Sequence, residues 1–128
     1  MIARIASVML VTAALVCAQD KISVGTYKGS WAGASSGGDF RLAITADSKG
    51  ALGAGVGFTI EGQDVPCKVI SVKIDGASIQ MVYEFDLQGN KLQSAIKGTL
   101  KGKTIEGTYK TTAGDSPVDE GTWKTTAQ

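Results

Sequence analysis

Seven glycine-containing turns recur along this chain at nearly equal intervals, and their spacing restricts the folds that it can adopt. The segments between and beside them are eight in number, similar in length, and too short to contain a crossover helix. Segments of this kind pair with their sequence neighbours as antiparallel hairpins. The pattern predicts an all-β protein, an eight-stranded antiparallel up-and-down β-barrel. The turn glycines are Gly37, Gly50, Gly62, Gly76, Gly89, Gly102 and Gly114, at spacings of 13, 12, 14, 13, 13 and 12 residues.

Apolar and polar residues alternate within these segments, as expected for strands with one buried face. In the stretch 97–111, for example, Leu100, Ile105 and Tyr109 fall on one side, and charged residues fall on the other. Charged outer faces are the reverse of the pattern in an outer-membrane barrel, so we expect a water-soluble barrel. The phasing turns all eight aromatic residues inward: Tyr27, Trp31, Phe40, Phe58, Tyr83, Phe85, Tyr109 and Trp123.

The fourth segment changes phase in its middle. Its apolar residues are Val65, Cys67 and Val69, followed out of step by Ile70, Val72 and Ile74. A one-residue bulge at Val69–Ile70 would turn both sets inward. Pro66 lies near the start of the segment, where a missing donor costs least.

The first 18 residues have the pattern of a secretory signal peptide. A basic start at 1–4 precedes an apolar core at 5–16 that is too short to span a bilayer, and Ala18 ends a small-residue cleavage site. We expect cleavage there, a mature domain of residues 19–128, and a secreted or periplasmic location. A lipid anchor at Cys17 is disfavoured, because Val16 departs from the bacterial lipoprotein pattern.

Cleavage would leave Cys67 as a lone cysteine, so the mature domain would lack an internal disulfide. It can be a reactive thiol or a small buried hydrophobe, and its apolar flanks favour the second. The mature chain carries 12 basic and 12 acidic residues once Arg4 is removed. This balance gives no electrostatic attraction for nucleic acid.

The first predicted strand carries Gly29-Ser30-Trp31, a Gly-x-Trp sequence. Together with the eight-strand meander, it resembles the calycin superfamily, the lipocalins and avidins. The resemblance covers the architecture of residues 25–126 and three residues of motif. It implies a barrel that closes near this tryptophan and holds a small ligand inside.

Residues for catalysis and for metal binding are scarce. The chain has no histidine, and Cys67 therefore lacks an imidazole partner. Asp115, Asp119 and Glu120 can be read as calcium ligands, but their spacing lacks the regular pattern of a calcium loop, and a polar loop is favoured. We predict no enzyme activity, no metal and no cofactor.

The glycines at 53, 55 and 57 lie on the outer face of a strand and do not form a phosphate loop, because no Lys-Ser/Thr pair or helix follows. They indicate sharp curvature or the close approach of another chain, and the oligomeric state stays open.

The barrel interior is the remaining candidate site. Ser94 and Thr111 are inward polar residues, and Gly29, Gly33, Ala46, Ala54, Gly98, Gly107 and Gly121 are inward small residues that would leave space. We predict an exported, non-enzymatic protein that binds a small apolar or amphipathic molecule. The alternative is a solid-cored protein-interaction module of the cell envelope, an inhibitor or a scaffold. The predicted ligand-binding residues are Tyr27, Trp31, Phe58, Tyr83, Tyr109 and Trp123.

Overall fold

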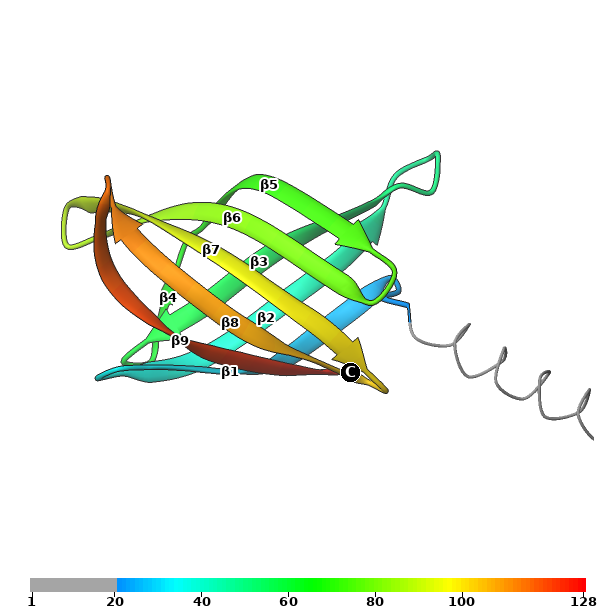
Figure 1. The fold of residues 1–128 in the computed structure, drawn as a ribbon, viewed down its shortest axis with the longest axis horizontal. Helices are drawn as coiled ribbons and strands as arrows, with labels where there is room; N and C mark the ends of the chain where they lie inside the picture. Colours follow the sequence, from blue (N-terminus) through cyan, green and yellow to red (C-terminus); the bar gives the residue numbers. More distant parts are fainter. Residues whose placement is uncertain (1–20) are drawn as a thin grey trace, which may run out of the picture.

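The computed structural model describes residues 21–128, which form one antiparallel sheet of nine strands (Figure 1). The expected signal peptide, residues 1–18 with Cys17, lies outside the described residues. The order across the sheet is β4-β3-β2-β1-β9-β8-β7-β6-β5. The strands are β1 (Gly25–Gly33), β2 (Gly37–Ala46), β3 (Leu52–Ile60), β4 (Gln63–Val65), β5 (Lys68–Asp75), β6 (Ser78–Leu87), β7 (Asn90–Lys101), β8 (Thr104–Ala113) and β9 (Ser116–Ala127).

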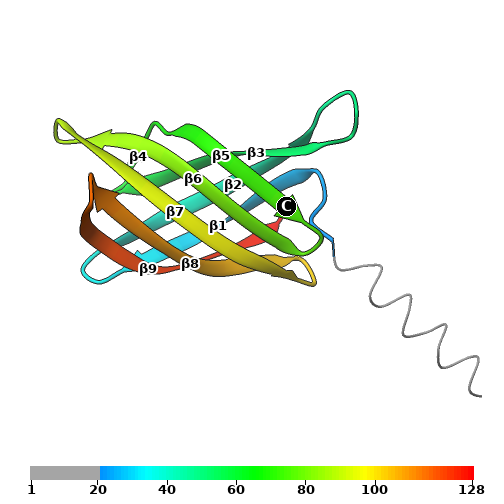
Figure 2. The same ribbon diagram turned by 45° about the horizontal axis from the view of Figure 1, so that its top comes forward.

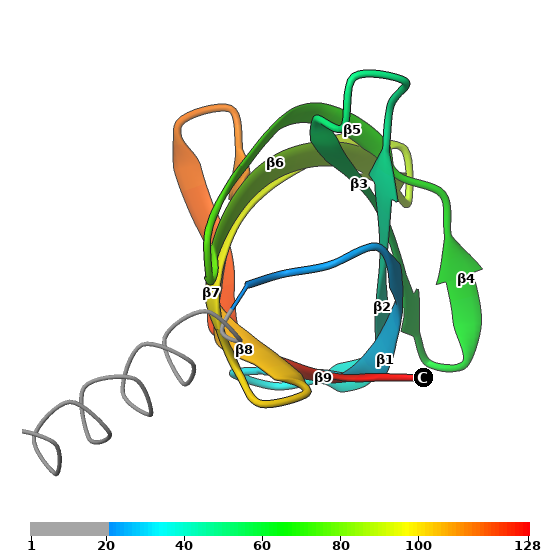
Figure 3. The ribbon, with the colours of Figure 1, turned by 90° about the vertical axis from the view of Figure 1, so that its right-hand side faces the viewer.

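The sheet curls strongly, so that its first and last long strands meet. β1 pairs with β9 along seven positions, and Trp31 lies directly opposite Trp123. The predicted meander and its pairing of first with last strand are therefore confirmed. Figure 3 looks along the axis of the curl, and Figure 2 shows how obliquely the strands cross that axis.

The prediction of eight strands is wrong at the fourth segment, which splits into β4 and β5. Pro66 has no N–H to donate to a ladder, and the chain leaves the sheet at Pro66–Cys67 before it returns. The predicted bulge is present, because the β5–β6 register shifts between Val69 and Ser71. The extra residue, Ile70, is 49% exposed and does not point inward as we expected.

The hydrogen-bonded sheet has two edges, β4 and β5, so the predicted closed ladder is incomplete. β4 pairs only with Phe58–Ile60 at the end of β3. The rest of β3 lies beside β5 without a ladder between them. Leu52, Ala54 and Val56 along this seam are partly buried, whereas Leu42 and Ile44, which pair with Val56 and Ala54 from β2, are almost wholly buried.

The turn glycines have the backbone that tight turns demand. Six of the seven adopt positive φ, from 61° at Gly114 to 83° at Gly50 and Gly89. In this region of φ a side chain is strained, so glycine is favoured. The seventh, Gly37, lies in β2 and pairs with Ala32. It is a strand residue and not the turn residue that the spacing predicted.

The inward glycines make room for neighbouring strands and not for a ligand, which corrects the expectation that they leave space. A Cβ on Gly29 would collide with the carbonyl oxygen of Lys124, and one on Gly107 with that of Lys97. Gly121 is likewise covered by Ala32. At these three positions a side chain would force β1, β9, β8 and β7 apart, because the added Cβ would collide with the backbone of the adjacent strand. Ala46, also expected inward, is exposed at the end of β2.

The outer-face glycines of β3 have a different explanation. The Arg41 guanidinium lies over Gly57, 2.8 Å from where a Cβ would be, and reaches toward Asp64 on β4 at 3.8 Å. Because Gly57 has no side chain, the Arg41 side chain has room to cross β3 at this position. Gly55 faces open space, and a Cβ on Gly53 would make an ordinary contact with Thr45. Contact with another chain there stays a prediction.

The interior divides along its axis into two halves with different fillings. We call the end with the β2–β3, β5–β6 and β7–β8 turns the packed half. The most deeply buried side chains lie there, and Ile22 from the lead segment covers them, its N–H donating to the Gly76 carbonyl at 2.9 Å. All eight aromatic residues are buried, as predicted. The most deeply buried side chains are Leu42, Ile44, Ile79, Met81, Ile105 and Thr125.

No helix among residues 21–128 is long and apolar enough to cross a membrane.

Candidate functional site

The other half of the interior, at the end of the β1–β2, β3–β4, β6–β7 and β8–β9 connections, contains a cavity of about 250 Å³. We call it the hollow half. The cavity is partly open to solvent, and the lining at its mouth includes Ser35 and Ser36 of the β1–β2 loop, Leu87 at the end of β6 and Val118 near the start of β9. Seven of the chain's eight aromatic residues line it: Trp31, Phe40, Phe58, Tyr83, Phe85, Tyr109 and Trp123.

Five of the six predicted ligand-binding residues lie around this cavity: Trp31, Phe58, Tyr83, Tyr109 and Trp123. The sixth, Tyr27, is buried at the opposite end of β1, and its hydroxyl donates to the Ser23 carbonyl at 3.2 Å. Alternation correctly gave the face of the sheet on which Tyr27 lies, but it does not say at which end of the interior.

Three ring pairs around the cavity meet edge to face, and three more are tilted at 35° to 51°. The Trp31 ring is perpendicular to those of Phe58 and Tyr109, with centroids 6.1 Å and 5.9 Å away. Phe58 in turn meets Phe85 at 5.0 Å and an interplanar angle of 80°. Edge-to-face pairs are favourable but bulky, and rigid rings held this way cannot collapse to fill the space between them.

The indole N–H groups of both tryptophans are engaged by the protein. Trp31 Nε1 donates to the carbonyl of Thr59 at 2.9 Å, and Trp123 Nε1 donates to the carbonyl of Thr108 at 3.0 Å. These bonds fix the two rings in place and satisfy buried donors, so the indoles present ring surface to the cavity.

The hydroxyl groups deep in the cavity form a small polar site. Ser94 and Thr111 lie opposite each other on β7 and β8, with their oxygens 2.6 Å apart. The Tyr83 hydroxyl lies close to Ser94. Burial raises the pKa of Tyr83 well above its usual range, the charge of Cys67 raises it further, and the Ser94 hydrogen bond lowers it. Tyr83 is therefore neutral at physiological pH and can donate or accept a hydrogen bond.

Asp119 is a functional candidate that the sequence argument missed. It is the one charged residue in the cavity lining, and it lies opposite Thr111 on the inward face of β9. Its Oδ2 accepts a hydrogen bond from the Tyr109 hydroxyl at 2.7 Å, and its Oδ1 accepts one from the Ala34 N–H at 3.3 Å. The sequence contained the signal, because Asp119 lies two and four residues before Gly121 and Trp123, and alternate residues of a strand point to the same face.

The Asp119 carboxylate affects the pKa of its hydrogen-bond partner, Tyr109. Burial raises the pKa of Tyr109 above its usual range, and the neighbouring Asp119 carboxylate raises it further. A phenolate beside a carboxylate would be unfavourable in this partly enclosed site. Tyr109 therefore stays protonated and donates this hydrogen bond throughout the physiological pH range.

Cys67 lies in the break between β4 and β5, where it is free and partly buried. Its thiol donates to the Val65 carbonyl at 3.3 Å. Burial raises the pKa of this thiol to about 11, against a smaller lowering by Arg41. Because the thiolate is the nucleophile, such a thiol is poorly reactive at neutral pH.

Among residues 21–128, no group of three or more potential ligands is arranged to hold a metal ion. The calcium reading of the β8–β9 connection therefore gains no support from geometry. Asp119 faces the cavity, whereas Glu120 lies exposed opposite Lys110.

No protein-family model matches this chain, and no similar protein is found among the curated proteins or the solved structures.

Proposed function

We propose that the protein is an exported, non-enzymatic binding protein that holds one small, mainly apolar molecule in its hollow half. The observation that carries the proposal is the aromatic cavity of about 250 Å³ at one end of an otherwise packed interior. A cavity of ~150 Å³ accommodates benzene, and drug-sized ligands occupy roughly 300 Å³ or more. The expected ligand is therefore about the size of one ring with a short substituent.

The lining supports binding and not catalysis. Aromatic and aliphatic side chains predominate, with a few convergent polar groups at Ser94, Thr111, Tyr83 and Asp119. This is the usual composition of a small-molecule pocket. The chain has no histidine, and burial keeps the thiol of Cys67 protonated. The described residues around the cavity therefore offer neither an imidazole nor a thiolate as a general base.

The resemblance to calycins supports the same use of the interior. Gly29-Ser30-Trp31 lies on β1 beside β9, and Trp31 forms part of the cavity wall. The likeness to that superfamily, which rests on the curled meander and this tryptophan, is itself part of the proposal.

The test is a panel of small aromatic, aliphatic and amphipathic compounds screened against the purified protein by native mass spectrometry and tryptophan fluorescence. Bound ligand should change the emission, because both tryptophans line the cavity. Silence across the panel, together with a protein partner captured by crosslinking, would favour the cell-envelope interaction module instead.

A matched pair of variants locates the binding. Leu87→Trp places a large ring at the mouth of the cavity, where Leu87 is partly buried, and should abolish binding. Leu52→Trp makes the same change at a partly buried leucine of the packed half, and binding should persist. Loss of binding in Leu52→Trp alone would contradict the assignment of the site to the hollow half.

A further inference from the structure

We propose that the cavity selects a positively charged ligand: a small aromatic or apolar body with a protonated amine directed at the Asp119 carboxylate. This inference rests on the proposed function, and it adds the charge of the ligand. Asp119 is the one ionisable carboxylate in the lining, which contains no lysine or arginine. Each of its oxygens accepts one hydrogen bond within the protein, and about half of its acceptor capacity therefore remains for a ligand.

The protein holds this carboxylate at the cavity wall. Asp119 lies on the inward face of β9, opposite Thr111. Both its Oδ2 and the Tyr109 hydroxyl pack over Gly33, where any side chain would collide with them. Three strands thus position one carboxylate at the rim of an apolar space, and an ammonium group that entered the mouth would meet it directly.

The rings next to Asp119 add a second attraction for a cation. Tyr109 donates to Asp119, and its ring stands at 86° to the ring of Trp31 with centroids 5.9 Å apart. A cation within about 6 Å of a ring centroid is attracted by the ring's negative face. Both indole N–H groups are already bonded to backbone, so the tryptophans do not compete as donors for an anion.

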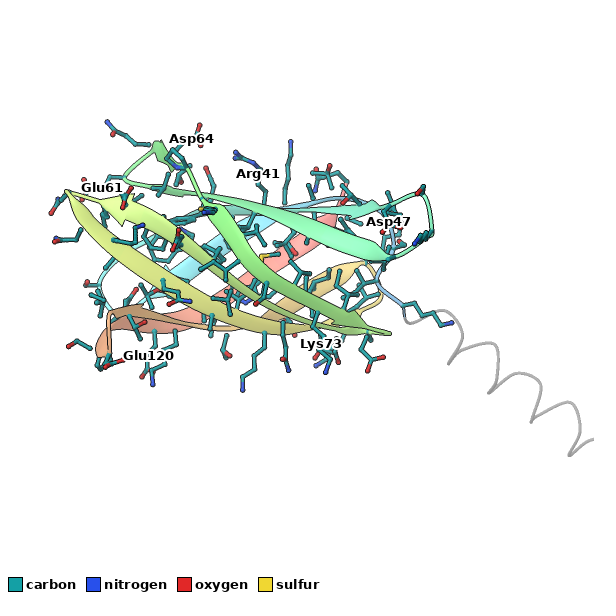
Figure 4. All side chains as sticks on the ribbon, turned by 90° about the horizontal axis from the view of Figure 1, so that it is seen from above. Arg41, Asp47, Glu61, Asp64, Lys73 and Glu120 are labelled. Carbon is teal, nitrogen blue, oxygen red and sulfur yellow. The ribbon has the colours of Figure 1, made fainter. Side chains whose placement is uncertain are left out.

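The distribution of charge over the whole molecule also favours a cation at the hollow half. If each described residue is assigned to the nearer end of its strand, the hollow half has eight acidic and four basic side chains, and the packed half three acidic and eight basic. Figure 4 shows Glu61, Asp64 and Glu120 at the hollow end and Asp47 at the far end. The hollow half holds Asp39, Glu61, Asp64, Glu84, Asp86, Asp115, Asp119 and Glu120 with Arg41, Lys68, Lys91 and Lys110; the packed half holds Asp47, Asp75 and Glu106 with Lys21, Lys28, Lys49, Lys73, Lys97, Lys101, Lys103 and Lys124.

A nearly neutral total, 12 basic and 11 acidic side chains among residues 21–128, thus hides a polarised molecule with an acidic rim at the cavity end. Such a rim concentrates cations and repels anions within about a Debye length of the surface. An anionic ligand would lose hydration next to Asp119 without gaining a basic partner in the lining, which is unfavourable.

The experiment compares three probes of one shape and different charge: 2-phenylethylamine, 2-phenylethanol and 3-phenylpropionate. Each is titrated into the isotopically labelled protein at pH 7 and low salt, and binding is followed by chemical-shift changes of the backbone amides. We expect the amine to bind about tenfold more tightly than the alcohol, because the donor to the Asp119 carboxylate becomes charged. The carboxylate should bind at least about tenfold more weakly than the alcohol.

Two variants test whether Asp119 is responsible for the preference for the amine. Asp119→Asn removes the charge and keeps an acceptor for Tyr109, so the amine and the alcohol should become equal. Glu120→Gln removes one charge from the adjacent, outward position of the same strand, and the tenfold preference should persist. The amide spectrum of each variant checks its fold, and the wild-type series decides the question even if one variant misfolds.

The outcomes separate this inference from the proposed function. Equal binding of amine and alcohol to the wild type would overturn the selection of a cation and leave the cavity as a ligand site. Absence of binding by all three probes would overturn both. An equal loss of preference in Asp119→Asn and Glu120→Gln would place selectivity in the surface field and overturn the role given to Asp119.

Discussion

The two halves of the interior are built from the same strands, yet one is solid and the other hollow. In the packed half, branched and flexible side chains such as Leu42, Ile79 and Ile105 are fully buried. In the hollow half, seven rings surround a cavity of about 250 Å³. Aliphatic side chains have rotamers that adapt to fill irregular space, whereas hydrogen-bonded indoles and phenols are fixed in orientation. The comparison teaches that a level of the interior rich in fixed rings keeps a cavity, whereas a level rich in aliphatic side chains packs solid.

The largest expected difference between the halves is in the cost of truncation. Ile105→Ala in the packed half should lower the free energy of unfolding by about 2–5 kcal/mol, because it creates a cavity in close-packed surroundings. Leu87→Ala at the mouth of the hollow half should cost only about 1 kcal/mol, since Leu87 is partly buried and already borders empty space. Urea unfolding at pH 7 measures both, and equal costs would contradict the division.

A smaller effect is expected at Gly107, one of the inward glycines that the backbone of an adjacent strand covers. Gly107→Ala should destabilise the protein by about 1–3 kcal/mol, because the new Cβ meets the carbonyl of Lys97 on the adjacent strand. The matched control is Gly55→Ala on the outer face of β3, where nothing lies within 4 Å. That change should be neutral or stabilise by up to about 1 kcal/mol through the unfolded state. Thermal unfolding ranks the two variants, and the reverse order would show that the curl does not depend on Gly107.

The smallest effect near neutral pH is expected from three groups with raised pKa values in the hollow half, which lower the stability only at alkaline pH. Cys67, Tyr83 and Tyr109 border this half, and burial raises the pKa of each above its unfolded value. The folded protein thus binds these protons more tightly than the unfolded chain does. Their contribution to stability is complete below about pH 9 and is lost as the pH rises, first through the thiol range between 9.0 and about 11.

Unfolding free energies measured in urea at pH 7, 9, 10 and 11 check this response. Cys67→Ser should remove the part of the loss that begins near pH 9 and leave the tyrosine part, which begins near pH 10. A stability that stays constant to pH 11 in the unmodified protein would contradict burial as the cause of the raised pKa values.

Much of the fold could be predicted because its signals are local. Turn glycines at positive φ and period-two alternation act within a few residues, so the strands, their antiparallel order and the inward aromatics followed from sequence. The split at Pro66–Cys67 was harder to foresee. Whether a segment pairs on both of its sides depends on partners far away in the chain. A proline near a strand start is compatible both with one continuous strand and with two separate strands.

The candidate site was predicted in part, for a related reason. Parity placed Trp31, Tyr83 and Tyr109 inside, and it would have placed Asp119 inside had the charge not been assigned to a loop. Parity also selected Tyr27, which belongs to the packed half. Whether an inward residue borders a cavity depends on its level along the axis, and that level is fixed by strand tilt and register.

By itself, the sequence determined that this chain forms a meander of short strands with one apolar face, because turn chemistry and side-chain alternation are properties of neighbouring residues. Only the tertiary structure decided which inward residues pack solid, where the cavity lies, and that Asp119 stands at its rim beside Tyr109. These features arise from contacts between strands that are distant in sequence, and the close approaches at Gly29, Gly107 and Gly121 set how far those strands curl.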